Sequence, residues 1–330
     1  MRLRELGEQA LLDWIRRRAG RKRTKGLLLG IGDDAAVLRV GTGKKKALAT
    51  SDMMLEGVHF DLCCQTPYQL GFKLVSVNVS DIYAMGGQPR FAFFEIGAPS
   101  DTPVEFTKQI FEGVFDALDL YKAVLAGGDV CASRSGLVLN MSVIGEGEKI
   151  IKRSGARVGD SLYVTGPLGD SACGLALMKK IGKPVNIEKK GKINEPLPWE
   201  VMKPLLERHL MPFVKRKKPP QRATAMMDIS DGLLIDAIRL CKESAVGVKI
   251  YEAGIPVSPQ MREAARFLGA DALMLAKTGG EDYELLYTAA GTKAGGTLIG
   301  EIIESGYYIA GPSGAVRKFR SGGYEHFSGT

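Results

Sequence analysis

Several aspartates in this chain of 330 residues stand in the same local sequence context. In each case a short run of apolar or small residues leads into an acid, often beside glycine or serine. Such acids can hold a divalent cation, because their side chains are short and small neighbours allow a ligand close to the backbone. The acids that follow this pattern are Asp33 and Asp34, Asp52, Asp81, Asp129, Asp228 and Asp231, and Glu281 and Asp282.

Each acid taken alone also has a structural explanation. Asp81 and Asp231 stand where helix N-caps belong, and Asp129 follows two glycines as a turn residue would. The recurrence of the pattern favours a functional interpretation, in which acids at strand ends converge on one cleft. Converging carboxylates form an all-oxygen site suited to Mg²⁺, and we therefore expect chemistry on phosphate groups.

The segment Gly30–Ala35 has the G-x-G-x-x-A spacing of dinucleotide-binding loops, but its chemistry is different. Asp33 and Asp34 occupy the positions where a pyrophosphate needs bare backbone amides. Like charges about 4 Å apart repel by ~4 kcal/mol at an effective dielectric constant of 20, and a bound metal ion reverses that sign. The sequence also contains no G-x-x-x-x-G-K-[ST] loop and no G-x-S-x-G elbow, which excludes P-loop enzymes and serine hydrolases of that type.

Composition limits the remaining classes of protein. Hydrophobic residues make up 45% and charged residues 25% of the sequence, as in ordinary globular proteins. The five cysteines form no C-x-x-C pair, which argues against a zinc site or a disulfide framework and favours the cytoplasm. We expect no membrane segment. The net charge of +8 lies mainly in glycine- and proline-bordered segments, which favours a solvated surface over nucleic-acid binding; these are Arg16–Lys25, Lys44–Lys46, Lys189–Lys192 and Lys215–Lys218.

Strand and helix signals alternate along the chain, which predicts a mixed α/β or α+β protein. At this length we expect two domains, 1–147 and 148–330, with the boundary at the glycine-bearing turn near Gly145. The N-terminal segment predicts an amphipathic helix that buries Leu6, Ala10 and Trp14. The other predicted elements are strands at Lys46–Thr50 and Leu137–Ile144, helices with capping signals at Thr66, Thr102 and Ser258, and a long surface excursion at Lys179–Pro198.

Together these motifs resemble the thiamine-monophosphate kinase family over nearly the whole chain. The glycine–aspartate motifs are shared with relatives on the same fold, the aminoimidazole ribonucleotide and selenophosphate synthetases among them. The features that point to the thiamine branch are Gly57–Phe60, Gly279–Glu284 and the aromatic ending Gly323–Phe327. The shared motifs are Gly30–Asp34, Thr50–Asp52, Asn78–Gly86, Gly127–Asp129, Arg153–Ala156, Tyr163–Gly166 and Asp228–Leu233.

The resemblance implies an ATP-dependent phosphorylation of thiamine monophosphate to thiamine diphosphate, assisted by several Mg²⁺ ions. It implies an aminoimidazole-ribonucleotide-synthetase-like fold with a mostly antiparallel N-terminal sheet, which pairs in a homodimer to form a barrel, and a C-terminal α/β domain. Asp34, Asp129, Asp228, Asp231 and Arg153 would be catalytic. The implied metal ligands are Asp34, Thr50, Ser51, Asp52, Asp81, Asp129, Asp228 and Asp231; the implied ATP contacts are Tyr121, Gly128, Asp129, Arg153 and Ser230; and the implied thiamine contacts are His59, Glu281 and Phe327.

Alternatives remain at this point. A related synthetase would use the same metals and ATP, although the selenium branch is disfavoured because no cysteine precedes Cys63. A basic binding protein without catalysis would need none of the acids and would bind nucleic acid in a salt-sensitive way. His59 and Phe327 have structural alternatives as packing residues of a strand and of the core.

Overall fold

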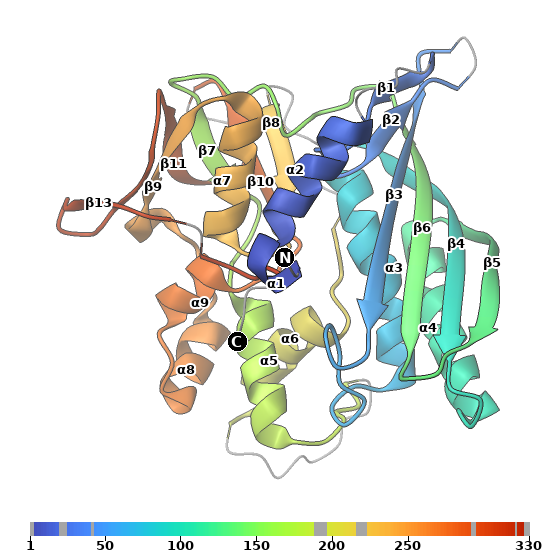
Figure 1. Ribbon diagram of the computed structural model, residues 1–330. Coiled ribbons are helices and arrows are strands. Elements are labelled where there is room, and N and C mark those ends of the chain that lie inside the picture. Colours follow the sequence, from blue (N-terminus) through green and yellow to red (C-terminus); the bar gives the residue numbers. More distant parts are fainter. Residues whose placement is uncertain are drawn as a thin grey trace.

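The computed structural model describes residues 3–19, 25–40, 43–187, 197–215, 223–291, 295–320 and 322–326, and it contains two sheets with helices packed against them (Figure 1). The mixed α/β class predicted from the sequence is confirmed. All strands of the first sheet end by Gly147, and the second sheet begins at Ser161. The elements of the first part are α1 Leu3–Leu6, α2 Glu8–Ala19, β1 Leu27–Leu29, β2 Ala36–Leu38, β3 Lys46–Leu55, α3 Pro67–Ala84, β4 Gln88–Ala98, α4 Val104–Tyr121, β5 Val124–Ala132 and β6 Val138–Gly147.

Among the described residues, the first sheet has six strands in the order β1-β2-β3-β6-β4-β5, and all neighbours are antiparallel except β4 and β5. Helices α3 and α4 cover one face, where Leu48, Met141 and Phe94 are buried. The opposite face carries exposed apolar side chains, because residues alternate between the two faces along each strand. The sheet therefore has one packed face and one open face.

Two glycines bring α3 and α4 into close contact. A Cβ atom on Gly71 of α3 would lie 1.9 Å from the carbonyl oxygen of Ile110, and one on Gly113 of α4 would lie 2.0 Å from that of Tyr68. The helices thus cross with backbone against backbone, which places α3 against β3 and β6.

Gly71→Ala should therefore destabilise the protein although alanine is the better helix former. The added methyl group forces the two helices apart, and overpacking of this kind costs about 1–3 kcal/mol. Chemical denaturation measures the change in the free energy of unfolding. Gly43→Ala is the matched control, because a Cβ atom there meets nothing within 4 Å. Equal stability of the two variants would contradict the packing argument.

In the described part of the chain, the second sheet has seven strands in the order β13-β12-β9-β11-β7-β10-β8. Its large core joins β7, β8, β9 and β11 to helices α5, α6, α7 and α8. Every pairing is antiparallel except that of β12 with β9. The elements are β7 Ser161–Val164, α5 Asp170–Ile181, α6 Trp199–Leu210, β8 Ala223–Asp228, α7 Leu233–Ser244, β9 Gly247–Tyr251, a 3₁₀ turn Glu252–Gly254, α8 Pro259–Leu268, α9 Ala272–Thr278, β10 Leu285–Ala289, β11 Thr297–Ile303, β12 Tyr307–Ala310 and β13 Val316–Lys318.

Helix α3 also connects the two parts of the molecule. Ser80 Oγ donates a hydrogen bond of 2.5 Å to the Asp228 carboxylate at the end of β8, and Gln69 Nε2 donates one of 2.7 Å to the carbonyl of Val185. Cys64, in the loop before α3, packs in the core of the second sheet. One helix thus belongs to the first sheet and contacts the second part at both of its ends.

The capping signals were correct at two of three helices. Thr66 and Gln69 form the predicted capping box of α3, and Ser258 caps α8, which ends at Gly269. The box predicted at Thr102 is wrong, because α4 begins at Val104 after Pro103 without a side-chain cap. The two predicted strands are present and extend further, to Leu55 and to Gly147. The middle of the predicted excursion, residues 188–196, lies outside the described residues.

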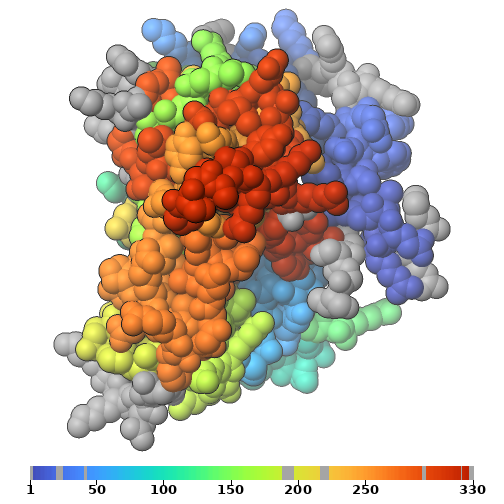
Figure 2. All heavy atoms as spheres, turned by 90° about the vertical axis from the view of Figure 1, so that its left-hand side faces the viewer, coloured from blue at the N-terminus to red at the C-terminus, as the bar shows by residue number. Residues whose placement is uncertain are grey.

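The N-terminal segment is helical as predicted, but its predicted burial is wrong. Neither of the described helices α1 and α2 contains a buried residue, and Trp14 is 57% exposed. Polar contacts hold the segment instead: Arg16 pairs with Glu243 of α7 at 2.5 and 2.8 Å, and Glu8 accepts a hydrogen bond of 2.8 Å from the His326 amide. Figure 2 shows this blue segment beside the red C-terminal part of the chain.

Within the part of the chain that the structure describes, no helix is both long enough and apolar enough to cross a membrane.

Candidate active site

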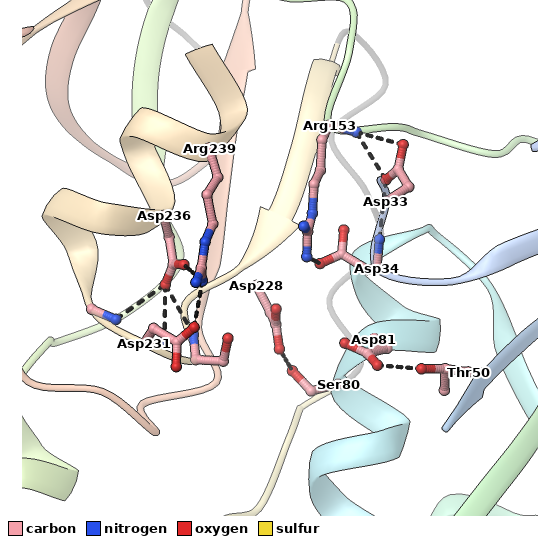
Figure 3. Close-up of polar contacts among 12 residues, drawn as sticks. Asp33, Asp34, Thr50, Ser80, Asp81, Arg153, Asp228, Asp231, Asp236 and Arg239 are labelled. Atoms are coloured by element: carbon pink, nitrogen blue, oxygen red, sulfur yellow. Dashed lines mark hydrogen bonds and ion pairs between the residues drawn. The ribbon is translucent and has the colours of Figure 1, made fainter. Parts of the chain in front are cut away.

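Three carboxylates from distant parts of the sequence meet between the two sheets. Asp34 lies in the loop between β1 and β2, Asp81 lies in the last turn of α3, and Asp228 ends β8. One oxygen from each lies within 4.8 Å of the others (Figure 3). The predicted convergence is present for these three acids, but the prediction that the acids stand at strand ends holds only for Asp228. The N-cap alternative for Asp81 is wrong, because α3 continues through it.

Hydroxyl groups and a fourth acid surround this cluster, which we call the carboxylate cluster. Thr50 Oγ1 of β3 donates a hydrogen bond to Asp81, and Ser80 donates to Asp228. Asp52 of β3 lies on the same face as Thr50, and its side chain is hydrogen-bonded to Asp81. The site is lined by oxygen atoms, which are the ligands that Mg²⁺ prefers.

The charges of these acids oppose one another. Burial, followed by the charges of Asp52 and Asp228, raises the pKa of Asp81 well above its ordinary value. Burial and the charge of Asp34 do the same to the pKa of Asp228, and burial raises the pKa of Asp52 to about 6. A bound dication would offset this repulsion, so the cluster suits an ion with at least two positive charges.

Arg153 joins the second part of the chain to the first acid of the cluster. Its Nη2 donates to Asp34 Oδ1 at 2.7 Å, and its backbone amide donates to both oxygens of Asp33 at 3.0 and 3.2 Å. Burial and the charge of Asp34 raise the pKa of Asp33 to about 6. Asp33 thus holds the loop in place, while Asp34 points to the cluster.

Two buried atoms at this point lack partners. Among the described residues, neither Asp34 Oδ2 nor Arg153 Nε has a hydrogen-bond partner. An unsatisfied buried carboxylate oxygen costs about 1–3 kcal/mol, more when the group is charged. The open carboxylate oxygen of Asp34 suits a cation, and the open N–H of Arg153 suits an anionic group. A metal ion bound to a phosphate would satisfy both.

Asp231 belongs to the same sequence motif as Asp228, but its side chain is held apart from the carboxylate cluster. Arg239 of α7 pairs with the carboxylates of Asp231 and Asp236, at 2.9 Å from the latter. Asp236 accepts hydrogen bonds of 3.1 to 3.2 Å from the amides of Ser230, Asp231 and Gly232. Asp236, and not Asp231, therefore caps the start of α7, so the N-cap alternative for Asp231 is wrong as well.

Two predicted residues, Ser51 and Asp129, lie on the open face of the first sheet. Ser51 points away from Thr50 and Asp52, and it contacts Ser142 and Asn140. Asp129 of β5 is opposite Glu95 in the strand register, and Gly128 precedes it. Asp129 is exposed, and its carboxylate accepts a hydrogen bond only from the next amide, among the contacts of the described residues. The structure therefore does not bring these residues to the carboxylate cluster of the same chain.

Tyr121, a predicted ATP contact, lies in the core of the first part. Its hydroxyl is 3.0 Å from both Ser76 Oγ and the Val214 amide, and its ring stacks on Phe213. Burial raises the pKa of this phenol to about 12. These contacts account for the residue through packing, and its contact with ATP stays a prediction.

Two of the three predicted thiamine contacts lie near each other. His59 accepts a hydrogen bond of 3.1 Å from the Leu55 amide, and its ring lies edge-on to that of His326, with 5.2 Å between the centroids. Burial, followed by the charge of His326, lowers the pKa of His59, whereas the charge of Glu281 raises it. Phe327 lies outside the described residues.

Sequence reasoning missed several residues that organise the site. Asp236 and Arg239 hold Asp231, while Lys73 and His209 contact Glu281. A signal existed for Lys73, because a single lysine interrupts the apolar run from Leu70 to Val75 in a helix. No comparable signal marked the other residues, whose partners are distant in the sequence or are backbone amides.

Comparisons with known proteins show which families share this sequence and fold. Two family models match most of the chain: the N-terminal domain of AIR synthase related proteins over residues 32–146, and their C-terminal domain over residues 157–310. The thiamine-monophosphate kinase of Aquifex aeolicus is 38% identical over 291 residues, with 87% of each chain covered, and that of Corynebacterium glutamicum is 36% identical, with 83% of this chain and 81% of the other covered.

Solved structures agree with these relatives. The complex of AaThiL with AMPPCP and TMP is 34% identical, covers 99% of both chains and has a TM-score of 0.83. Hydrogenase maturation protein HypE in complex with ATP is only 16% identical and has a TM-score of 0.62 over 98% of both chains, which supports the fold alone.

The two sheets and the carboxylates between them thus define a protein of the AIR synthase related class, which confirms the predicted fold. Within that class, the chain belongs to the thiamine-monophosphate kinase family.

If the carboxylate cluster binds Mg²⁺, the ion should raise the melting temperature of the protein relative to EDTA. Asp81→Asn should weaken that response by at least half, because the amide keeps the shape but loses the charge. Without metal the variant should be as stable as the parent or more so, since a buried like charge is removed. Thermal melting in EDTA and in about 5 mM Mg²⁺, a concentration chosen to saturate an ordinary site, measures both effects.

Asp271→Asn is the control for this experiment. Asp271 caps α9 away from the cluster, and asparagine caps about equally well. Its response to Mg²⁺ should match that of the parent. An undiminished response of Asp81→Asn would show that the ion binds elsewhere.

Proposed function

We propose that this protein transfers the γ-phosphoryl group of ATP to thiamine monophosphate, forming thiamine diphosphate, with Mg²⁺ held at the carboxylate cluster. The observation that carries the proposal is the meeting of Asp34, Asp81 and Asp228 within 4.8 Å, with one buried oxygen of Asp34 left open toward a ligand. The names of the relatives, together with the AMPPCP and TMP bound in one solved relative, support this choice of donor and acceptor.

Asp34, Asp81 and Asp228 would bind the metal, with Asp52 and Thr50 as further oxygen donors. Asp231 would join them if Arg239 released its carboxylate. Bound Mg²⁺ would supply charge neutralisation for the phosphates that meet in this reaction. The predicted roles of Ser51 and Asp129 as metal ligands require a site on the open face of the sheet, which a second subunit would have to complete.

Arg153 is the side chain best placed to bind a phosphate. Its guanidinium is anchored to Asp34 through one nitrogen, while Nε stays available among the described residues. A planar guanidinium can donate two parallel hydrogen bonds to a phosphate, which fixes orientation as well as charge. The other predicted ATP contacts are Gly128, Asp129, Ser230 and Tyr121, and we propose that the first three act through backbone and carboxylate groups.

No general base is required for this transfer. The acceptor phosphate is already an anion at neutral pH, so catalysis depends on bringing anions together in line and neutralising their charge. His59 and Glu281 would then serve the thiamine moiety, and Phe327 would stack on one of its rings. The predicted cytoplasmic location is consistent with five free cysteines.

We further propose a homodimer formed through the open face of the first sheet. Exposed apolar side chains from four neighbouring strands share this face, and they are Met53, Ile144, Phe91 and Val124. Pairing two such faces would bury these side chains and close the two sheets into a barrel. It would also bring Asp129 and Ser51 of each subunit into the interface.

Ile144→Lys should therefore produce a monomer, because a charge in the centre of a buried apolar face is costly. Sedimentation equilibrium or light scattering would measure the molar mass of the parent and the variant. Val158→Lys is the control, since Val158 is exposed on the second part of the chain. A parent that is monomeric at micromolar concentration would contradict the proposed dimer.

The catalytic proposal predicts that substitution of Asp228 or Asp231 lowers turnover, whereas substitution of the capping residue Asp271 does not. Asp228→Asn and Asp231→Asn should each keep near-normal melting temperatures and lose at least about a hundredfold in turnover, the scale of losing one electrostatic stabiliser. Steady-state assays with ATP and thiamine monophosphate at saturating Mg²⁺ measure turnover. EDTA should abolish activity of the parent, and Mg²⁺ should restore it.

Asp271→Asn is again the matched control and should retain full activity. Stable variants of Asp228 and Asp231 with near-normal turnover would remove both residues from the catalytic site. Full activity of the parent in metal-free buffer would contradict the role of the carboxylate cluster.

A further inference from the structure

A buried polar network lies beside the predicted thiamine site and includes residues that no motif accounts for. Lys73 Nζ of α3 is 2.8 Å from Glu281 Oε1, and His209 Nδ1 of α6 is 3.0 Å from Glu281 Oε2. The side chains of Lys73 and His209 are only 1% and 3% exposed, whereas that of Glu281 is 31% exposed. Each oxygen of Glu281 thus has one buried partner, while one side of the carboxylate remains accessible.

The network fixes the charge of Glu281. Burial alone would raise the pKa of this carboxyl, but the charge of Lys73, followed by contact with His209, lowers it below its ordinary value. Burial and the charge of Lys73 also lower the pKa of His209. At neutral pH Glu281 therefore stays ionised, while the imidazole of His209 is neutral.

The backbone of Glu281 also needs support. Its φ of +63° lies in the left-handed region, which is unfavourable for a residue with a side chain. The Glu281 amide donates a hydrogen bond of 2.7 Å to the carbonyl of Ser230, next to Asp228 and Asp231. A Cβ atom on the preceding Gly280 would lie 2.5 Å from the same carbonyl, so only glycine allows this approach. The position of Glu281 is thus tied to the loop that carries the acids.

Lys73 is buried, and its Nζ lies 2.8 Å from Glu281 Oε1, so the ion pair holds the carboxylate in place. The charges of Lys73 and Glu281 both act on His59. Glu281 therefore lies near His59, the other predicted thiamine contact among the described residues.

We infer that Lys73 and His209 are positioning residues that hold Glu281 ionised and aimed at the acceptor substrate. The thiamine moiety contains a cationic thiazolium ring and an amino group on a pyrimidine, and a fixed carboxylate can recognise either one. This inference rests on the proposed function, because it assigns Lys73 and His209 to the recognition of the acceptor and not of ATP.

The main test is Lys73→Met, which keeps the length of the side chain and removes the charge. The apparent KM for thiamine monophosphate should rise at least about tenfold, equivalent to losing ~1.4 kcal/mol of binding. The apparent KM for ATP should change less than about twofold, since the inference assigns Glu281 to the acceptor and not to ATP. Calorimetric titration of thiamine monophosphate into the metal-free protein provides a second measurement that does not depend on turnover.

The rise in the KM for thiamine monophosphate caused by Lys73→Met should depend on Glu281. In a Glu281→Gln background, Lys73→Met should therefore add little to the KM for thiamine monophosphate, because the charge that Lys73 orients is already absent. His209→Gln and His209→Phe form a second pair of variants that leaves α3 intact. Glutamine can still donate to Glu281 and should keep the KM near that of the parent, whereas phenylalanine should raise it.

Three results would overturn the inference. One is an equal rise of both KM values in Lys73→Met, which would indicate a general structural role. Another is an undiminished effect of Lys73→Met in the Glu281→Gln background. The third, decisive if Lys73→Met does not fold, is an equal KM for His209→Gln and His209→Phe. A parent protein that does not phosphorylate thiamine monophosphate would instead refute the proposed function. The activity of the parent is therefore measured before any variant is tested.

Discussion

Repulsion among buried carboxylates is the constraint on which the rest of the structure depends. Asp34 and Asp81 come from a loop and a helix of the first part of the molecule, and Asp228 comes from a strand of the second. Hydroxyl groups and Arg153 relieve only part of this repulsion, since one oxygen of Asp34 remains without a partner among the described residues. The protein therefore keeps a site that is unfavourable by itself and favourable with a cation, as expected where function takes precedence over stability.

The two sheets account for how such a site can be held together. Each part has its own apolar core, so neither depends on the site for its folding. Polar contacts between the parts include two at the acids, namely Ser80 with Asp228 and Arg153 with Asp34. Separate cores supply the stability, and the contact between the parts supplies the chemistry.

Much of this arrangement could be predicted from local sequence. The caps of α3 and α8 were readable because capping depends on residues three positions apart, and the acid motifs identified the cluster. Burial of Trp14 was predicted wrongly, since an amphipathic pattern does not say whether a partner surface exists. The partnership of Lys73 with Glu281 was out of reach, because their distance in the sequence says nothing about their distance in space.

Helix α3 carries residues of both candidate sites on one rigid rod. Lys73 faces Glu281, whereas Asp81 faces the other acids, and the two positions lie ~12 Å apart along the helix axis at 1.5 Å per residue. Backbone contact with α4 at Gly71 leaves this rod little freedom to tilt or slide. In the proposed function, acceptor choice and metal geometry are therefore mechanically coupled. A new acceptor specificity should be easier to obtain by changing the loops around His59 than by altering α3, where any shift would also displace Asp81, the proposed metal ligand.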